Sequence, residues 1–270
     1  MFDGVQCPCI LLQLVATGKP LSTVGMRIED RTRTFIIAME RTVVPENFSF
    51  RMTDEEYRVL EKIKNSIPVC YLADHADFAL GIVTGNNKKF LSAEKTEHSE
   101  MVLKGTDICK YHINPAKQYL RFEPEQFQQV APLEIYRAPE KLLYRFISNQ
   151  LVVAYDDRQM LSLNSCNIVI PKIEGMQIKY ILAILNSSVS QFVYQKEFHS
   201  IKVLRAHMEH IPIPRVGKAI QNEIIAMTEP LICGMGKEAA ETCQKRLDCR
   251  IMDLFRLSAE EQWIIRHALH

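Results

Sequence analysis

The chain has 270 residues and a formal net charge of +1, with 47% hydrophobic and 24% charged residues. This composition is ordinary for a soluble globular protein of one large domain or two modest ones. A net charge near zero excludes a global field that would draw the whole chain to nucleic acid or to a membrane. An anionic partner must therefore be met by a local patch or with help from another domain.

The cysteine pattern argues against both a zinc site and a disulfide scaffold. The eight cysteines lie at positions 7, 9, 70, 109, 166, 233, 243 and 249, and none forms a Cys-x-x-Cys pair. A chain this long and this apolar does not need disulfides, so we predict reduced thiols and a cytoplasmic location. The apolar run at residues 9–16 is too short to cross a bilayer and lacks the flanks of a signal peptide, so we expect no membrane partner.

The first third of the chain predicts strands followed by a helix. Short apolar runs at residues 9–16 and 33–40 are typical of strands. Thr53 and Glu56 have the spacing of a capping box, which predicts that a helix begins there. This helix should end near Asn65, before a proline.

The middle of the chain alternates strand-like and helix-like runs. Residues 78–85 resemble a strand that enters a glycine-containing loop. Pro139 suits the first turn of a helix, which predicts a helix over residues 139–147. The apolar runs 150–155 and 163–170 predict a hairpin, with the five residues 156–160 as its connection.

A longer helix is predicted over residues 179–194, because four residues recur on one face, namely Ile181, Leu185, Ser188 and Phe192. The proline-rich segment 211–215 should stop regular structure and mark a boundary.

The last part of the chain predicts three helices. The first has an apolar stripe that should be interrupted at Pro230 and at the following glycines; its residues are Ile220, Ile224, Met227 and Leu231. The second has a similar stripe, formed by Ala240, Cys243, Leu247, Ile251 and Leu254. Ser258 and Glu261 then cap a third, short helix that carries Trp263.

The loop at residues 81–90 (GIVTGNNKKF) is the first candidate for binding. Its glycines, Gly81 and Gly85, fit neither a Walker phosphate loop nor a dinucleotide-binding fingerprint. Asparagine can pair with the edge of adenine and lysine with phosphate or guanine. On residue types alone, a plain turn with solvated lysines is the simpler interpretation. The side chains that the loop would present to DNA are Thr84, Asn86, Asn87, Lys88 and Lys89.

No pattern in the sequence predicts catalytic or metal-binding residues. His199, His207 and His210 lie close together, but no His-Glu-x-x-His motif is present, so no metal is expected. Basic residues with tyrosines between them are slightly enriched in some segments, as they often are on nucleic-acid-binding surfaces. Many solvent-exposed faces of other proteins have the same composition. The further candidates for DNA contact are Lys104, Lys110, Tyr111, Arg137, Arg145, Arg158, Lys202 and Arg205.

Taken in order, the motifs of residues 81–90, 103–111, 137–146, 180–194 and 208–215 resemble TaqI-like C-terminal specificity domains. These are the target-recognition domains of adenine-specific DNA methyltransferases and of fused restriction–modification enzymes. Residues that match the family's opening motif are Gly81, Ile82, Thr84, Gly85, Asn87 and Phe90. Residues 185–187 match its Leu-Asn-Ser helix and residues 211–214 its closing segment.

The resemblance implies an α+β fold, namely a mixed-sheet specificity domain with a C-terminal helical tail. Residues 1–68 would be the last strands of a methyltransferase domain with a connecting helix, 69–215 the DNA specificity domain, and 216–270 the tail. The implied partners are double-stranded DNA and the methyltransferase domain of the same bacterial parent chain. S-adenosylmethionine would be a cofactor of that parent and not of this fragment.

Two other functions stay open. The C-terminal helices could form a protein-interaction module, or one of the cysteines could serve a stand-alone thiol hydrolase. A stable partner that binds independently of salt and DNA would favour the first, and one abnormally reactive cysteine the second.

The purified chain should neither bind S-adenosylmethionine nor methylate DNA. The sequence lacks an Asn-Pro-Pro-Tyr tetrad, whose role is to hold the flipped adenine, and it lacks the glycine-rich cofactor loop. Transfer of a labelled methyl group to DNA by the 270-residue chain would contradict this expectation.

Overall fold

The computed structural model describes residues 13, 22–29, 33–41, 49–198 and 200–269. The chain divides into two compact units, residues 1–42 and 43–270, which are considered separately. The three domain ranges expected from the sequence remain a prediction. In the described part of the chain, no helix is both long enough and apolar enough to cross a membrane.

The first unit contains a small antiparallel hairpin. Strand β1 (Arg27–Glu29) pairs with β2 (Thr34–Ile36), and Ile28 lies opposite Phe35. Of the strand predicted over residues 33–40, the part that forms is Thr34–Ile36. The strand predicted over residues 9–16 lies outside the described residues, except for Gln13, which has no regular structure.

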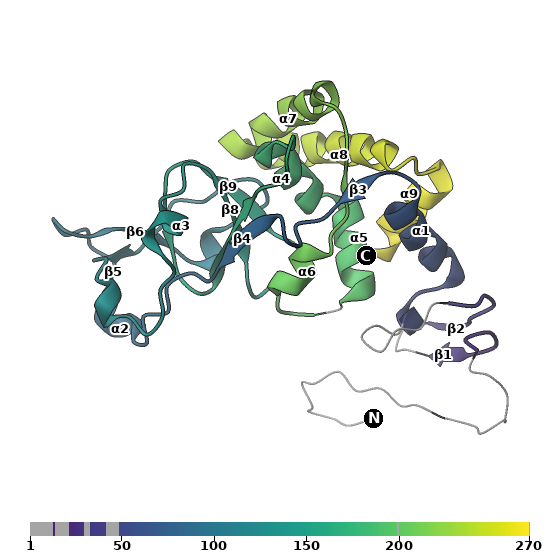
Figure 1. Cartoon of the computed structure of the whole chain (residues 1–270), viewed down its shortest axis with the longest axis horizontal. Coiled ribbons are helices and arrows are strands. Elements are labelled where there is room, and N and C mark those ends of the chain that lie inside the picture. Colours follow the sequence, from purple (N-terminus) through teal and green to yellow (C-terminus); the bar gives the residue numbers. More distant parts are fainter. Residues whose placement is uncertain (1–12, 14–21, 30–32, 42–48, 199, 270) are drawn as a thin grey trace. The chain divides into compact units, whose positions relative to one another are not determined.

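The second unit contains two four-stranded sheets (Figure 1). One has the order β4-β11-β8-β9 and is antiparallel throughout; its strands are β4 (Ala76–Ala79), β11 (Cys166–Pro171), β8 (Lys141–Arg145) and β9 (Val153–Asp156). The other has the order β10-β6-β7-β5, with β10 (Leu161–Ser162), β6 (Glu100–Leu103), β7 (Tyr119–Leu120) and β5 (Leu91–Ser92). Because β10 runs parallel to β6 and the other pairs are antiparallel, the predicted mixed-sheet α+β fold is confirmed.

An apolar core joins the two sheets. Leu143 and Ile168 from the first sheet pack in one cluster with Val102 and Leu120 from the second, and all four are fully buried. Short helices α2 (Asn87–Phe90) and α3 (Leu133–Tyr136) flank this core, and the 3-10 turns at 105–107 and 124–126 lie in its connections. The second sheet and the loops around it are therefore held as one body with the first sheet.

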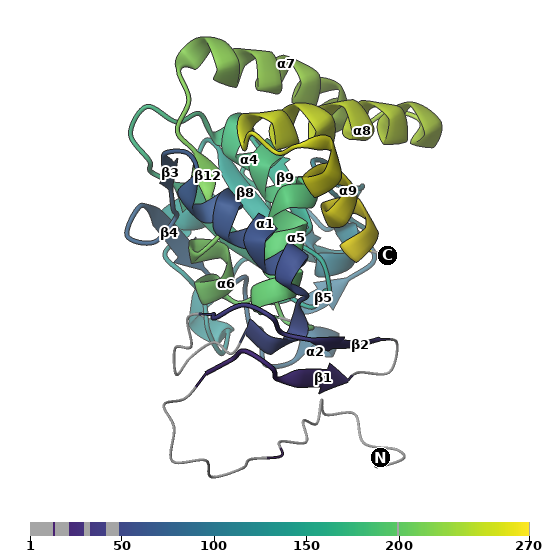
Figure 2. The ribbon, with the colours of Figure 1, turned by 90° about the vertical axis from the view of Figure 1, so that its right-hand side faces the viewer.

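Helices cover the other side of the first sheet (Figures 1 and 2). Helix α4 packs against β8 and β9, α5 packs against α8 and α9, and α1 also contacts α9. The helices are α1 (Asp54–Asn65), α4 (Ile178–Asn186), α5 (Ser188–Glu197), α6 (Arg205–Glu209), α7 (Lys218–Cys233), α8 (Lys237–Leu254) and α9 (Ala259–Ala268). A 3-10 turn at 49–51 precedes α1.

Local capping signals located two helices correctly. Thr53 caps α1 and accepts a hydrogen bond from the Glu56 N–H, while the Glu56 carboxylate accepts one from the Thr53 N–H. Ser258 and Glu261 form the same reciprocal pair at the start of α9. Helix α8 also occupies its predicted span.

The helix predicted over residues 139–147 is wrong, because this run forms the central strand β8. An apolar run of this length cannot be assigned by periodicity, and burial between two neighbouring strands decides its conformation. The predicted hairpin is wrong in its pairing for the same reason. Strands β9 and β11 exist, but each pairs with β8, which lies between them.

The single helix predicted over residues 179–194 is interrupted at Ser187, which ends α4 in an extended conformation and caps α5. Conversely, Pro230 does not break α7. Pro230 and Ala226, whose carbonyl loses its helical donor, are both exposed, so water can replace the missing hydrogen bond. The segment 211–215 also contains regular structure, since β12 (Ile213–Pro214) pairs with β3 (Val69–Cys70).

A fully buried ion pair lies at the edge of the first sheet. The Lys141 ammonium lies 2.6 Å from the Asp156 carboxylate and donates to the Tyr136 carbonyl, also at 2.6 Å. Asp156 accepts two more hydrogen bonds, from the N–H groups of Arg158 and Met160. Burial lowers the pKa of Lys141, and the charge of Asp156 opposes this shift. The carboxylate thus fixes both the start of β8 and the turn that leaves β9.

Replacing Asp156 with alanine should destabilise the protein by about 3–5 kcal/mol, because a buried ammonium loses its counter-charge. The control is Lys172→Ala, which removes an exposed ion pair with Asp77 and should cost at most about 1 kcal/mol. Urea unfolding followed by circular dichroism measures both. Equal midpoints for the two variants would show that the buried pair matters no more than the surface pair.

Candidate nucleic-acid interface

The loop at residues 81–90 is held by backbone hydrogen bonds on two sides. The Ile82 N–H donates to the Ser162 carbonyl at 2.7 Å, and the Asn164 N–H donates to the Ile82 carbonyl at 3.1 Å. On the other side, Val83 exchanges both backbone hydrogen bonds with Gln129, at 2.9 and 3.1 Å. These bonds fix where the loop leaves the core.

Gly81 is required by close packing. A Cβ atom at this position would lie 2.2 Å from the carbonyl oxygen of Leu163, which is well inside van der Waals contact. Gly85 is required for a different reason, since its φ of +75° lies in the left-handed region that glycine adopts without strain. The two glycines therefore shape the loop.

Two polar side chains of the loop stabilise its own turn. Asn86 caps the four-residue helix α2, and its Oδ1 accepts a hydrogen bond from the Lys89 N–H at 3.2 Å. The hydroxyl of Thr84, which is almost completely buried, donates to Oδ1 of Asn87 at 2.6 Å and accepts from the Asn86 N–H at 3.2 Å. The oxygen of each asparagine is thus occupied within the loop.

Both lysines of the loop are exposed to solvent. Lys88 and Lys89 are exposed, and neither forms an ion pair in the described part of the chain. The Lys89 ammonium lies 4.6 Å from the ring centroid of Phe90, and this ring packs edge-on against Phe127 at 5.4 Å. Two uncompensated positive charges are therefore presented on a rigid turn.

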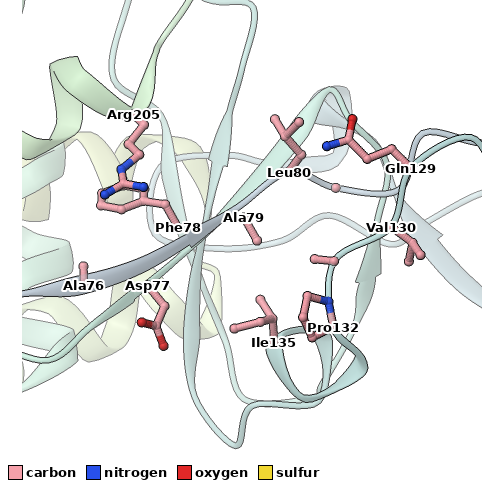
Figure 3. Close-up of a pocket in the computed structure, with 12 residues that line it drawn as sticks. Ala76, Asp77, Phe78, Ala79, Leu80, Gln129, Val130, Pro132, Ile135 and Arg205 are labelled. Carbon is pink, nitrogen blue, oxygen red and sulfur yellow. The ribbon is translucent and has the colours of Figure 1, made fainter.

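A groove of about 600 Å³ runs beside the loop along the edge strand β4 (Figure 3). Gln129 and Leu80 lie near one end, and Arg205 lies against Phe78 near the other, 5.3 Å from its ring centroid. The buried hydroxyl of Tyr136 donates to the Leu80 carbonyl and accepts from the Ala131 N–H, each at 3.2 Å. This hydroxyl fixes the wall of the groove where it meets the loop.

Some of the basic and aromatic candidates are used inside the fold. The Arg145 guanidinium donates to the carbonyls of Gly105 and Ile108. Tyr111 is buried, with a φ of +74°. Lys110 donates to the Asn186 carbonyl at 3.1 Å; burial lowers its pKa, and the charge of Asp248 opposes this shift. In these positions, the side chains of Arg145, Tyr111 and Lys110 stabilise the fold.

The remaining basic candidates lie nearer the surface. Arg137 binds the Glu100 carboxylate at 2.6 Å, and Arg205 binds Glu209 at 2.7 Å. Lys104 is half-buried, whereas Arg158 and Lys202 are exposed. The structure does not gather all candidates into one patch, and their contact with DNA stays a prediction.

The Leu-Asn-Ser segment has a structural role. The buried side chain of Asn186 accepts from the Val153 N–H at 3.1 Å and donates to the Val153 carbonyl at 2.8 Å. One residue after the helix break, Ser188 donates from its N–H and its hydroxyl to the carboxylate of Asp248, both at 2.9 Å. The junction of α4 and α5 thus connects the sheet to α8 of the tail.

The histidine and cysteine side chains do not form a metal-binding cluster in the described residues. No group of three metal-ligating side chains occurs among them. His207 stacks on Phe198 with ring centroids 4.5 Å apart, and burial lowers its pKa. Among the described residues, the cysteines at 70, 109, 166, 233, 243 and 249 form no disulfide.

Sequence reasoning missed the two exposed glutamines next to the loop. Gln129 pairs with Val83, and a Cβ atom on Gly85 would lie 3.5 Å from Oε1 of Gln128. They follow the last loop residue, Phe90, by 38 and 39 positions in the sequence, so only the antiparallel pairing reveals that they are its neighbours.

Residues 100–213 match the family model of the TaqI-like C-terminal specificity domain. The resemblance inferred from the motifs is confirmed over this part of the chain. No curated protein sequence matches the chain significantly.

Solved structures extend the similarity in fold. A structure of the type IIL restriction–modification enzyme MmeI in complex with DNA aligns with a TM-score of 0.51 at 11% identity, covering 74% of this chain and 35% of that one. The HsdS subunit from Thermoanaerobacter tengcongensis aligns with a TM-score of 0.40 at 14% identity, covering 80% and 50%. The chain thus spans about a third and a half of these proteins, and only the first score supports a shared fold.

Cys166 should resist a thiol reagent such as 5,5′-dithiobis-(2-nitrobenzoic acid) in the native protein and react only after unfolding. Burial raises the pKa of the Cys166 thiol, and the thiolate is the reactive form. Mass spectrometry of time points identifies the labelled positions, and the exposed Cys233 and Cys249 serve as controls. Preferential labelling of Cys166 would contradict the structure and favour a thiol enzyme.

Proposed function

Because residues 100–213 match the TaqI-like C-terminal specificity domain, we propose that this chain recognises a short site in duplex DNA as the target-recognition part of a restriction–modification protein. The family match is the observation that carries the proposal. The fold shared with the DNA-bound type IIL enzyme agrees with it.

The geometry of the loop supports DNA as the ligand. Lys88 and Lys89 are exposed and form no ion pair with any described residue, so each can neutralise a phosphate without first breaking such a pair. The backbone bonds of Ile82 and Val83 restrain the loop before DNA arrives, which lowers the entropy cost of binding. The net charge of +1 makes binding depend on such local contacts.

The finer form of the proposal concerns the parent protein. A methyltransferase domain of the same bacterial, cytoplasmic parent chain would bind S-adenosylmethionine, flip the target adenine out of the duplex and methylate its exocyclic amine. This chain would hold the duplex and select the site.

A protein-interaction role for the tail is the second candidate. Trp263 on α9 is 57% exposed and Met235, between α7 and α8, is 39% exposed, and such side chains are common at protein interfaces. Binding of a protein partner at high salt and without DNA, lost in Trp263→Ala, would favour this role.

The double variant Lys88→Ala, Lys89→Ala should weaken binding to all duplex sequences alike. Loss of one lysine–phosphate contact lowers the slope of log K against log salt concentration by about one. Loss of both lysines should therefore lower it by about two. Fluorescence anisotropy with a labelled duplex between low and moderate salt measures affinity and slope together.

The matched control is Lys237→Ala, Lys245→Ala, which removes the same charge from exposed positions on α8. It should leave the slope within the error of the wild type. Equal slopes for all three proteins would remove the loop from the DNA interface.

A further inference from the structure

The exposed amides near the loop differ in what they already bind. Oδ1 of Asn86 accepts the capping hydrogen bond of α2, and Oδ1 of Asn87 accepts the Thr84 hydroxyl. Bidentate pairing with adenine needs the amide oxygen as well as the amide nitrogen, in one plane. Each Oδ1 can accept a second hydrogen bond, but the bond it already accepts orients the amide for the turn and not for a base.

Gln128 has no such commitment. It is exposed, and its amide forms no hydrogen bond within the described part of the chain. A Cβ atom built on Gly85 would lie 3.4 Å from Cβ of Gln128 and 3.5 Å from its Oε1, so the side chain lies against the loop backbone. Because Gly85 has no side chain, the surface between the loop and Gln128 stays open.

The segment that carries Gln128 is restrained. The adjacent Gln129 exchanges two backbone hydrogen bonds with Val83, and Phe127 is packed between Phe90 and Phe122. An amide on a fixed backbone loses less entropy when it pairs with a base. Gln128 is therefore a free amide on a restrained segment, against the loop that carries Lys88 and Lys89.

Two neighbouring glutamines allow a close comparison. Gln126 is exposed, but its Nε2 donates to the Glu123 carboxylate at 2.9 Å. Gln129 has a free amide, but it lines the groove beside Leu80 (Figure 3). Among the three, Gln128 combines a free amide with a side chain that lies against Gly85 of the loop.

We propose that Gln128 reads a base of the recognised site, pairing through its amide with the N6 and N7 edge of an adenine in the major groove. This inference rests on the proposed function. Lys88 and Lys89 would hold the adjacent phosphates, and Asn86 and Asn87 would keep the loop in shape.

The test selects binding sites from a randomised duplex library with the full 270-residue chain at low salt. The wild type should enrich one motif that contains an adenine, and Gln128→Ala should lose preference at that position by about 5- to 150-fold. Its salt slope should not change, because no phosphate contact is removed. Gln126→Ala and Gln129→Ala are the matched controls and should keep the motif.

A second variant separates base reading from a structural effect. Gln128→Glu offers only acceptors, which suit the N4 amine of cytosine and not the adenine edge. The enriched base at that position should change from adenine to cytosine. Urea unfolding checks that both Gln128 variants retain the wild-type midpoint.

The outcomes distinguish the two proposals. If the wild type enriches a motif and both Gln128 variants keep it, or if only Gln129→Ala loses it, the role of Gln128 is overturned and DNA recognition stands. If the wild type binds duplex without any preference, or does not bind it, both the proposed function and the role of Gln128 are overturned.

Discussion

The backbones at Gly81 and Leu163 approach so closely that no side chain fits between them, and the candidate interface depends on this contact. The approach lets Ile82 bond to Ser162 and Asn164 on one side while Val83 bonds to Gln129 on the other. Three segments far apart in the sequence are thereby joined at the start of one loop. Glycine permits this close approach, because the Cβ atom of any other residue would force the two backbones apart.

The same framework explains why similar residue types have different roles. Arg145 and Lys110 bind backbone carbonyls inside the fold, and Lys141 is neutralised by Asp156. Lys88 and Lys89 lie on an exposed turn, and neither forms an ion pair with a described carboxylate. A basic residue can bind phosphate only where the fold has left its charge unpaired, so burial and partners are better guides here than the number of lysines and arginines.

The helical tail is coupled to the sheets through the break between α4 and α5. Asn186 binds Val153 of β9 on one side of the break, and Ser188 binds Asp248 of α8 on the other. A continuous helix would direct these groups elsewhere, because extended backbone at Ser187 is what turns the chain. The Leu-Asn-Ser motif therefore fits a structural role that holds the sheet and the tail in a fixed relation.

The sequence by itself determined those features whose causes are local. The capping boxes at Thr53 and Ser258 located α1 and α9, because both partners lie within one turn. The family motifs identified the specificity domain. Tertiary structure decided the rest, since residues 141–145 form a strand only because β9 and β11 lie beside them. It also decided that Asn87 supports the loop while the distant Gln128 is left free beside it. Whether a polar side chain is available to a ligand depends on neighbours that the fold brings from elsewhere in the chain, and local sequence cannot supply them.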